Sequence, residues 1–357
     1  MRLARERALL AQVVQGRRDP AEAEDSLAEL ERLAHTAGAE VVGAVTQRRV
    51  HPTPSLYIGE GKLADVQLAC RQGRANIVIF DNELSAVQAN NLDRALGIKV
   101  IDRTELILQI FARRARSAEA QLQVELAQLQ YLVSRIPVSA AQQRFQGGIG
   151  MRGPGESPLR LRNAPMRRRI GELKRKLALV HQRRARTRQR RGRWPLVSLV
   201  GYTNAGKSTL LNTLSTSKSA FVDDKLFATL DTKTRLVKLG EGREALLTDT
   251  VGFIRHLPHG LVASFRSTLD VAAMSDLLLV VADAGHARLA DHLQVVDETL
   301  AEIGAGAVKR QLVFNKCDTV AAPALESLRR RYPDACFVAA ARQQGLDTIR
   351  AVIAAKG

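Results

Sequence analysis

The sequence reads Gly201-Tyr-Thr-Asn-Ala-Gly-Lys207-Ser208 just beyond its midpoint, and this stretch decides the fold. It follows an apolar run, Leu196-Val-Ser-Leu-Val200, that is typical of a buried strand, and residues 208–214 are typical of a helix. A turn of the form G-x-x-x-x-G-K-S/T between a strand and a helix is the phosphate-binding loop of nucleotide-binding α/β domains. The alternative is a glycine-rich turn that binds nothing, and the Lys-Ser pair at the correct offset disfavours it.

The residue types of this loop suit phosphate chemistry. Gly201 and Gly206 let the backbone curl so that successive N–H groups point at phosphate oxygens, and the helix N-terminus adds partial positive charge. Lys207 can reach the β- and γ-phosphates, and the Ser208 hydroxyl can ligate Mg²⁺. The nucleotide contacts expected here are Gly201, Tyr202, Thr203, Asn204, Ala205, Gly206, Lys207, Ser208 and Thr209.

Two further motifs, each after a predicted strand, indicate which nucleotide binds. Asp249-Thr-Val-Gly252 follows the strand 244–248 and fits a carboxylate that holds Mg²⁺, with an amide at Gly252 that senses the γ-phosphate. Asn315-Lys316-Cys317-Asp318 follows the strand 311–314. The carboxylate of Asp318 can accept hydrogen bonds from the N1–H and the exocyclic amino group of guanine, a donor pair that adenine lacks. The sequence therefore predicts a site for GTP and GDP.

A GTP-dependent switch needs a hydroxyl that closes over Mg²⁺ and the γ-phosphate. The stretch Leu226-Phe-Ala-Thr229-Leu-Asp-Thr232 offers two, and we expect Thr229 to be the ligand, with Thr232 in reserve. The predicted metal ligands are Ser208, Thr229 and Asp249, and the predicted catalytic residues are Lys207, Thr229 and Gly252. The remaining expected nucleotide contacts are Phe227, Ala228, Leu230, Asp231, Thr250, Val251, Asn315, Lys316, Cys317, Asp318, Val338, Ala339 and Ala340.

In their order and spacing these motifs resemble the GTPases of the branch that contains Era, Obg and HflX, and the HflX family in particular. The strings Phe227-Ala-Thr-Leu-Asp231 and Asp249-Thr-Val-Gly-Phe-Ile-Arg-His-Leu-Pro258 are similar to the two switches of that family nearly residue for residue. The resemblance covers residues 25–350. It implies a P-loop GTPase domain that hydrolyses GTP with Mg²⁺, and a K⁺ ion held beside the phosphates by Asn204.

Two positions depart from what the resemblance leads us to expect. Phe253 stands where many GTPases have a water-orienting glutamine, and a phenyl ring cannot orient water by hydrogen bonding. Slow intrinsic hydrolysis is therefore implied, with the rest supplied by K⁺, backbone groups or a bound partner. Ala339-Ala340 replaces the usual Ser-Ala pair of the family. The amide of Ala340 can still meet the guanine O6, whereas the missing hydroxyl predicts weaker nucleotide affinity.

Positive charge is concentrated in one segment. The chain has a formal net charge of +18, and residues 152–193 hold sixteen Lys and Arg against two Glu, a net +14. A solvated helix face normally interlaces both signs, so this block indicates a polyanionic partner. Aromatic residues make up only 4% of the chain, which disfavours base stacking and favours structured RNA held by its phosphates and shape.

Strands and helices alternate through residues 1–110, which predicts a small α/β domain with a parallel sheet. Strands are expected at 41–45, 77–80 and 99–102, and helices at 23–37, 62–71 and 84–96. Gly59-Glu-Gly61-Lys62 lacks the spacing of a phosphate loop and is expected to be a loop-to-helix turn. The strings at 57–62, 84–92 and 100–108 resemble the N-terminal domain of the HflX family.

Residues 111–193 are expected to form a helical hairpin with a Gly-rich tip, ahead of a GTPase domain at 194–357. One long helix is expected from Arg103 to Arg135 and a second, which carries the basic run, from Met166 to Arg190. Gly147-Gly-Ile-Gly-Met-Arg-Gly-Pro-Gly-Glu156 resembles the family signature of a tip that reaches into ribosomal RNA, although Arg160 and Arg162 replace two acids that usually follow it. The predicted RNA contacts are Gly147, Gly148, Arg152, Arg183, Arg184, Arg186 and Arg188.

The bulk composition fits this organisation. The chain has 357 residues, 45% of them hydrophobic, which suffices for several domains with cores. No apolar run approaches the length of a membrane span, and no signal-peptide core follows the N-terminus. Cys70, Cys317 and Cys336 are too scattered for a disulfide framework or a zinc site and suit a reducing cytoplasm. We expect a cytoplasmic monomer.

Together these patterns predict a GTP-binding and GTP-hydrolysing protein whose hairpin and N-terminal domain contact RNA. By resemblance the partner is the ribosome, chiefly its large (50S) subunit and rRNA, and the role is to split or rescue stalled particles. Two alternatives stay open. One is an RNA-binding scaffold with a weakly active nucleotide site, which Phe253 and Ala339-Ala340 favour. The other is a GTP switch that acts on a non-ribosomal partner.

Overall fold

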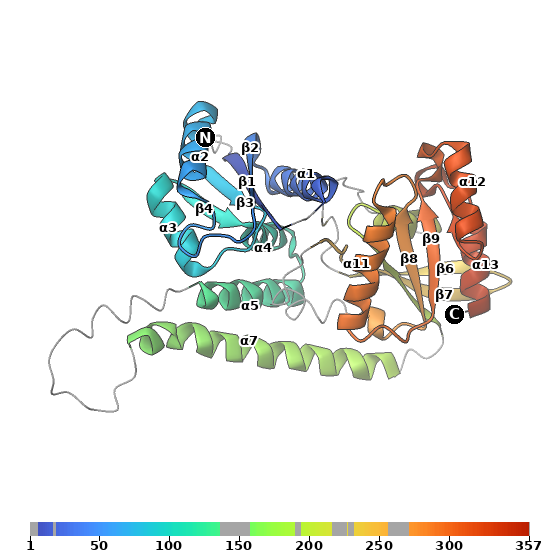
Figure 1. Cartoon of the computed structure of the whole chain (residues 1–357). Helices are drawn as coiled ribbons and strands as arrows, with labels where there is room; N and C mark the ends of the chain where they lie inside the picture. Colours follow the sequence, from blue (N-terminus) through green and yellow to red (C-terminus); the bar gives the residue numbers. More distant parts are fainter. Residues whose placement is uncertain are drawn as a thin grey trace, which may run out of the picture. The chain divides into compact units, whose positions relative to one another are not determined.

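The computed structural model describes residues 6–16, 19–135, 158–189, 194–215, 227, 232–255 and 271–356, with only the backbone for residues 158–163, 181 and 183–189. The chain divides into two compact units. The first comprises Met1–Arg113 and Leu122–Leu177, and the second comprises Arg114–Gln121 and Ala178–Gly357. Each unit contains one β-sheet (Figure 1).

The first unit is built on a four-stranded parallel sheet with the strand order β2-β1-β3-β4. Its strands are β1 (Arg7–Gln15), β2 (Glu40–Arg49), β3 (Ile77–Phe80) and β4 (Lys99–Asp102). The helices that alternate with them are α1 (Pro20–Ala37), α2 (Glu60–Gly73), α3 (Ala86–Leu96) and α4 (Arg103–Arg114). The expected parallel α/β arrangement is therefore present, and Gly59 begins α2 as the expected loop-to-helix turn.

Within the first unit, the sequence patterns do not assign the inner strand β1. Seven consecutive residues of β1 are buried, and Gln12 interrupts their apolar pattern. The Gln12 amide donates to Ala23 O at 2.8 Å and to Asp81 Oδ2 at 3.1 Å, so this buried polar group is satisfied by its tertiary partners.

A buried charged cluster lies near the carboxyl ends of β3 and β4. Arg103, at the start of α4, pairs with Asp81 at 2.7 Å and with Glu29 on α1, and all three side chains are almost fully buried. Burial alone would raise the pKa of Asp81, but the Arg103 charge and the hydrogen bonds from Ser26 and Gln12 hold that pKa below its ordinary value. The cluster therefore ties α1 and α4 to the same end of the sheet.

The long helix expected from Arg103 to Arg135 is in fact two helices, α4 and α5 (Ala118–Ser134). The break has a local cause, because the Ser117 hydroxyl accepts a hydrogen bond from Ala120 N at 3.1 Å and so begins a new helix. The basic helix α7 (Pro158–Gln189) starts eight residues before the predicted Met166, and Pro165 lies inside it.

Within the first unit α5 and α7 lie side by side (Figure 1). Leu126 packs against Leu173 and Leu177, and Arg169 donates two hydrogen bonds to the Glu125 carboxylate, at 2.7 and 3.0 Å. The described parts of α5 and α7 therefore pack against each other, and the Gly-rich tip of the predicted hairpin lies outside the described residues.

The second unit contains a six-stranded sheet in the order β10-β9-β8-β5-β7-β6, in which β6 is the antiparallel member. Its strands are β5 (Leu196–Val200), β6 (Lys233–Gly240), β7 (Arg243–Asp249), β8 (Leu277–Asp283), β9 (Arg310–Asn315) and β10 (Cys336–Phe337). Its helices include α8 (Lys207–Leu214), α11 (Leu289–Glu302), α12 (Ala322–Arg331) and α13 (Leu346–Lys356), with short 3-10 helices η1 (Cys317–Thr319) and η2 (Ala340–Arg342).

Both faces of this sheet are covered, because side chains along each strand alternate between two cores. On β8, Leu277, Leu279 and Val281 join the cluster of α8 and α13, whereas Leu278 and Val280 join the cluster of α11. The strands β5, β7, β8 and β9 run parallel, so their carboxyl ends lie at the same end of the sheet, where the loops that follow them meet. No helix in the described part of the chain is both long and apolar enough to cross a bilayer.

Candidate nucleotide site

The loop between β5 and α8 requires glycine at two positions. Gly201 has φ +150°, and a Cβ there would lie 2.1 Å from Val281 O on the neighbouring strand. Gly206 has φ +90°, and a Cβ there would lie 2.1 Å from the amide nitrogen of Asn315. The two glycines of the motif are thus fixed by close approach of other parts of the site as well as by backbone conformation.

Lys207 begins α8 and points back over the loop. Its Nζ donates to Gly201 O at 3.0 Å and to Tyr202 O at 2.8 Å, and the residue is only 6% exposed. Burial lowers the pKa of Lys207 to about 8, although the negative charge of Asp249 opposes the shift. The ammonium group is therefore held at the loop by carbonyl groups and is poorly solvated, so a phosphate would be a strong partner for it.

The side chains of Ser208 and Asp249 meet directly. The Ser208 hydroxyl donates to Asp249 Oδ2 at 2.5 Å, and Asp249 is fully buried at the end of β7. Parallel pairing of β5 with β7, which puts Leu199 beside Asp249, brings the two motifs together. A hydroxyl and a carboxylate are hard oxygen ligands of the kind that Mg²⁺ prefers, so the donor set fits this ion.

The segment after Asp249 is joined to the phosphate loop by backbone hydrogen bonds. Thr203 N donates to Phe253 O at 2.7 Å, and Phe253 N donates to Gly201 O at 3.1 Å. A Cβ on Gly252 would lie 2.9 Å from Thr203 Cα and 3.0 Å from Lys207 Nζ, so this position adjoins the lysine and admits no side chain. The Phe253 ring is 1% exposed and packs in the core cluster of α11.

A second anchor of this segment was not anticipated from the sequence. Arg255 N donates to the Tyr202 hydroxyl at 2.9 Å, and the Tyr202 ring stacks on His292 of α11 with ring centroids 3.7 Å apart. The Arg255 guanidinium also pairs with Asp291 of α11 at 2.9 Å. No local motif marks these contacts, since their partners are separated by 36 to 90 residues along the chain.

Asn315 joins three loops through one buried side chain. Its Nδ2 donates to Ala205 O in the phosphate loop at 2.9 Å, and its Oδ1 accepts from Ala340 N at 3.0 Å. The amide of Ala340, which we expected to be available for the guanine O6, therefore already has an acceptor. Cys317 N donates to Val338 O at 3.1 Å, which adds a direct link between the two base-proximal loops.

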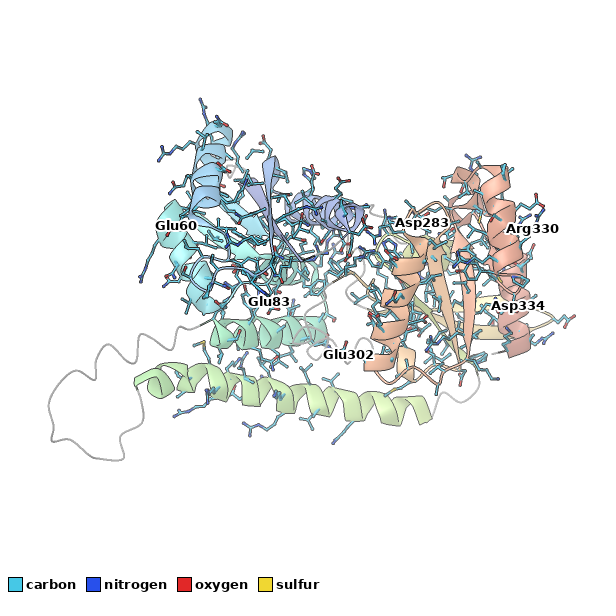
Figure 2. All side chains as sticks on the ribbon, viewed as in Figure 1. Glu60, Glu83, Asp283, Glu302, Arg330 and Asp334 are labelled. Carbon is cyan, nitrogen blue, oxygen red and sulfur yellow. The ribbon has the colours of Figure 1, made fainter. Side chains whose placement is uncertain are left out.

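Lys316 and Asp318, on either side of Cys317, both form ion pairs. Lys316, which has φ +60°, pairs through Nζ with Asp283 at 2.8 Å. Figure 2 labels Asp283, which ends β8. Asp318 pairs through Oδ2 with Arg342 Nε on η2 at 2.9 Å. The sequence motif identifies Lys316 and Asp318 but neither of their partners.

The predicted contacts differ in how far the structure describes them. Motifs that the structure brings to one edge of the sheet contain Gly201 to Thr209, Asp249 to Gly252, Asn315 to Asp318 and Val338 to Ala340. Phe227 is described and buried, with φ +55°. The predictions that lie outside the described residues are Ala228, Thr229, Leu230, Asp231, Gly147, Gly148 and Arg152.

For the remaining RNA predictions, Arg183, Arg184, Arg186 and Arg188, the structure gives only their place in the backbone of α7. Within the described ranges no group of three or more His, Cys, Asp or Glu side chains gathers to hold a metal. A predominantly carboxylate or imidazole metal centre is thus not found there, whereas a mixed site of Ser208 and Asp249 remains consistent with the contacts.

Known families match consecutive parts of this chain. Residues 24–112 match the model described as GTP-binding GTPase N-terminal, and residues 114–191 match the GTP-binding GTPase middle region. Residues 196–316 match the model described as 50S ribosome-binding GTPase. The third match covers the phosphate loop, the Asp249 motif and Asn315.

Whole relatives extend this match. The GTPase HflX of Caldanaerobacter subterraneus subsp. tengcongensis is 45% identical over 317 residues, which cover 88% of this chain and 73% of that protein. The chain belongs to the HflX GTPase family. The HflX of Escherichia coli is 42% identical over 300 residues, 82% of this chain and 70% of its own. The prediction of a GTP-hydrolysing member of the HflX family is therefore confirmed.

A solved structure supports the same fold. The crystal structure of SsGBP in complex with GDP matches this HflX-family chain with a TM-score of 0.53 and 25% sequence identity, and the match covers 98% of each chain. The α/β fold with a P-loop GTPase domain and an N-terminal domain is thereby confirmed.

Proposed function

We propose that this HflX-family GTPase binds the large ribosomal subunit through its rRNA and that GTP hydrolysis controls this contact, so that stalled particles are split or rescued. The observation that carries the proposal is the assembly of the phosphate loop, the Asp249 motif and the guanine loops around Asn315. The match of residues 196–316 to the model described as 50S ribosome-binding GTPase and the net +14 charge of residues 152–193 support the proposed partner.

The central residues of the predicted site have named roles in this proposal. Lys207 exchanges its two carbonyl partners for the β- and γ-phosphates, and Gly252, beside it, offers its amide to the γ-phosphate. Ser208, Asp249 and Thr229 hold Mg²⁺, which neutralises charge on the phosphates when it is bound. Asn315 and Lys316 shape the base pocket, and Asp318 selects guanine.

The proposed switch follows from the contacts of the segment after Asp249. Loss of the γ-phosphate removes the ligand of Gly252, and the change reaches α11 because Phe253 and Arg255 tie this segment to the phosphate loop and to Asp291. The position of Phe253 offers no hydrogen bond to water, so hydrolysis depends on other groups. We propose a K⁺ ion near Asn204, which has φ +62° and is exposed, as one of them.

The proposal describes a cytoplasmic monomer with three working parts. Residues 1–110 and the hairpin of residues 111–193 contact RNA, and residues 194–357 bind the nucleotide. The net positive charge of residues 152–193 supports RNA as the partner. A polyanion would neutralise the repulsion among these side chains, which few carboxylates of the same segment offset.

One experiment tests the proposed function against both alternatives. GTP hydrolysis by the wild type and by Lys207→Ala is measured with and without 50S subunits, in buffers containing K⁺ or Na⁺. We expect slow turnover that 50S subunits accelerate and that Lys207→Ala abolishes. Turnover that ribosomal subunits leave unchanged would favour a non-ribosomal partner, and no turnover with subunits present would favour the RNA-binding scaffold. Equal rates in K⁺ and Na⁺ would remove K⁺ from the mechanism.

A further inference from the structure

Arg342 forms an ion pair with Asp318, the carboxylate that is expected to select guanine. Its Nε lies 2.9 Å from Asp318 Oδ2, and the Arg342 side chain is 65% exposed whereas that of Asp318 is 17% exposed. The guanidinium therefore reaches Asp318 from the solvent side. Among the described residues no other ion pair or hydrogen bond to this carboxylate is found.

The neighbouring residues explain why Arg342 can take this position. Arg342 ends η2, which begins at Ala340 directly after the last core strand and its two-residue extension. The residues before it are Ala339, Ala340 and Ala341, so this loop offers no side-chain hydroxyl to Asp318. Backbone hydrogen bonds from Arg342 N to Ala339 O at 3.0 Å and from Ala339 N to Gln344 O at 3.1 Å fix the turn that carries Arg342.

The chemistry of the two partners of Asp318 is nearly the same. A guanidinium presents two parallel N–H donors to a carboxylate in a fixed fork, and guanine presents N1–H and its exocyclic amino group in a similar pair. Arg342 contacts Oδ2 of Asp318 through Nε, and guanine needs both oxygens of this carboxylate, so the base cannot bind in full while Arg342 stays there. We propose that Arg342 is an intramolecular competitor of guanine and lowers the nucleotide affinity of this chain by masking Asp318; this inference rests on the proposed guanine site.

This competition acts on the free protein, so it has a kinetic signature. Nucleotide can engage Asp318 only in the fraction of molecules whose Arg342 has swung away, and the apparent association rate constant is reduced by that fraction. Once the base has displaced Arg342, the dissociation rate constant is set by contacts that do not include this arginine. A residue that instead touches the bound nucleotide would change the dissociation rate constant.

The test is stopped-flow binding of a fluorescent GDP analogue to the whole chain, for the wild type and Arg342→Ala. The expected result is an association rate constant that rises about two- to fivefold, the range given by exposed ion pairs, with an unchanged dissociation rate constant. The ratio of the two association rate constants should approach one as salt is raised, because salt screens the Arg342–Asp318 pair. Arg342→Lys, which keeps the charge but lacks the fork, should give an intermediate rate.

Arg330→Ala is the matched control, since Arg330 is another exposed arginine of this unit and pairs with Glu326 on α12. Loss of positive charge alone should slow the binding of an anionic nucleotide, so Arg330→Ala should bind no faster than the wild type. The inference is overturned if Arg342→Ala binds more slowly or at the wild-type rate, if its dissociation rate constant changes, or if Arg330→Ala binds equally fast. A wild type that does not bind the analogue at all would overturn the proposed GTP site itself.

Discussion

At the scale of single residues, Asn315 links the phosphate loop to the base loop. Its one side chain serves a carbonyl in the phosphate loop and an amide in the base loop, and it is only 3% exposed. The motif at residues 315–318 includes Asn315, but the sequence alone does not explain why this position is an asparagine. The structure supplies that reason, since the side-chain amide carries a donor and an acceptor on separate atoms and here uses Nδ2 for Ala205 O and Oδ1 for Ala340 N.

We expect Asn315→Ala to lower the free energy of unfolding by about 1–3 kcal/mol, because Ala205 O and Ala340 N would be left buried and unpaired. GDP affinity should fall at least tenfold, since both loops lose their common link. Urea unfolding and calorimetric GDP titration check the two effects. Gln294→Ala, which removes an exposed amide on α11, is the control and should change neither.

The lowered pKa of Lys207 predicts that GDP binding depends on pH. Burial lowers its pKa to about 8 in the nucleotide-free protein, and a bound phosphate should raise that pKa again. Binding therefore takes up a proton when the pH lies above 8, and GDP affinity should fall by up to about tenfold per pH unit between pH 8 and 9. Calorimetry at pH 8.5 in buffers of different ionisation enthalpy measures this uptake directly. Zero proton uptake would contradict the lowered pKa.

The same shift predicts how the stability of the nucleotide-free protein depends on pH. Because the unfolded chain keeps Lys207 protonated up to its ordinary pKa, the unfolded state binds more protons than the folded state above pH 8. This residue therefore contributes stability that rises with pH from 8 towards 10.5. Comparing the slope of unfolding free energy against pH for the wild type and Lys207→Met isolates the contribution, and a steeper slope in the variant would contradict it.

At the scale of elements, one carboxylate fastens α5 to the sheet of the first unit. Asp102, fully buried at the end of β4, accepts from Leu84 N at 3.1 Å, from Glu105 N at 3.0 Å and from the Tyr131 hydroxyl at 3.0 Å. It also pairs with Arg135, whose guanidinium lies over the Tyr131 ring. Burial and the negative charge of Asp102 raise the pKa of Tyr131. These contacts thus attach the C-terminal end of α5, which precedes the Gly-rich segment, to the end of β4.

Asp102→Asn should therefore weaken the attachment of α5. We expect the free energy of unfolding to fall by about 1–3 kcal/mol, since an amide cannot accept all these hydrogen bonds or neutralise Arg135. If the Gly-rich segment contacts rRNA as proposed, affinity for 50S subunits should fall as well. Denaturant unfolding and subunit pelleting measure the two effects. Asp65→Asn, at an exposed pair with Lys62, is the control, and an equal loss of stability there would contradict a special role of Asp102.

Elements also show where a sequence predicts structure and where it does not. Strands β3, β4, β5 and β9 are predictable because their apolar runs are short, continuous and followed by a polar motif. Strand β1 escapes prediction because Gln12 looks out of place until Asp81 and Ala23 are beside it. The break before α5 depends on a single capping serine. Arg342 escapes prediction because it matches no motif and matters only through its position beside Asp318.

At the scale of the whole molecule, positive charge is concentrated in residues 152–193, which carry a net +14 of the chain's +18. Neutralising Arg183, Arg184, Arg186 and Arg188 to Gln should flatten the plot of log affinity for 50S subunits against log salt, by about 0.7–0.9 for each rRNA phosphate that these side chains no longer neutralise. Neutralising Arg329, Arg330, Arg331 and Arg350 removes the same charge elsewhere and is the control. If both quadruple variants give the same slope, the basic part of α7 is not a specific contact.

The inward packing of Phe253 has a consequence for timing. Its ring belongs to the same hydrophobic cluster as Val200, Leu278 and Val280, so repositioning it would open the core rather than adjust a loop. This side chain therefore stays packed in the core and does not orient an attacking water molecule. On the proposed function, the lifetime of the GTP-bound state would therefore depend on groups other than this side chain, namely K⁺, backbone groups or a bound partner.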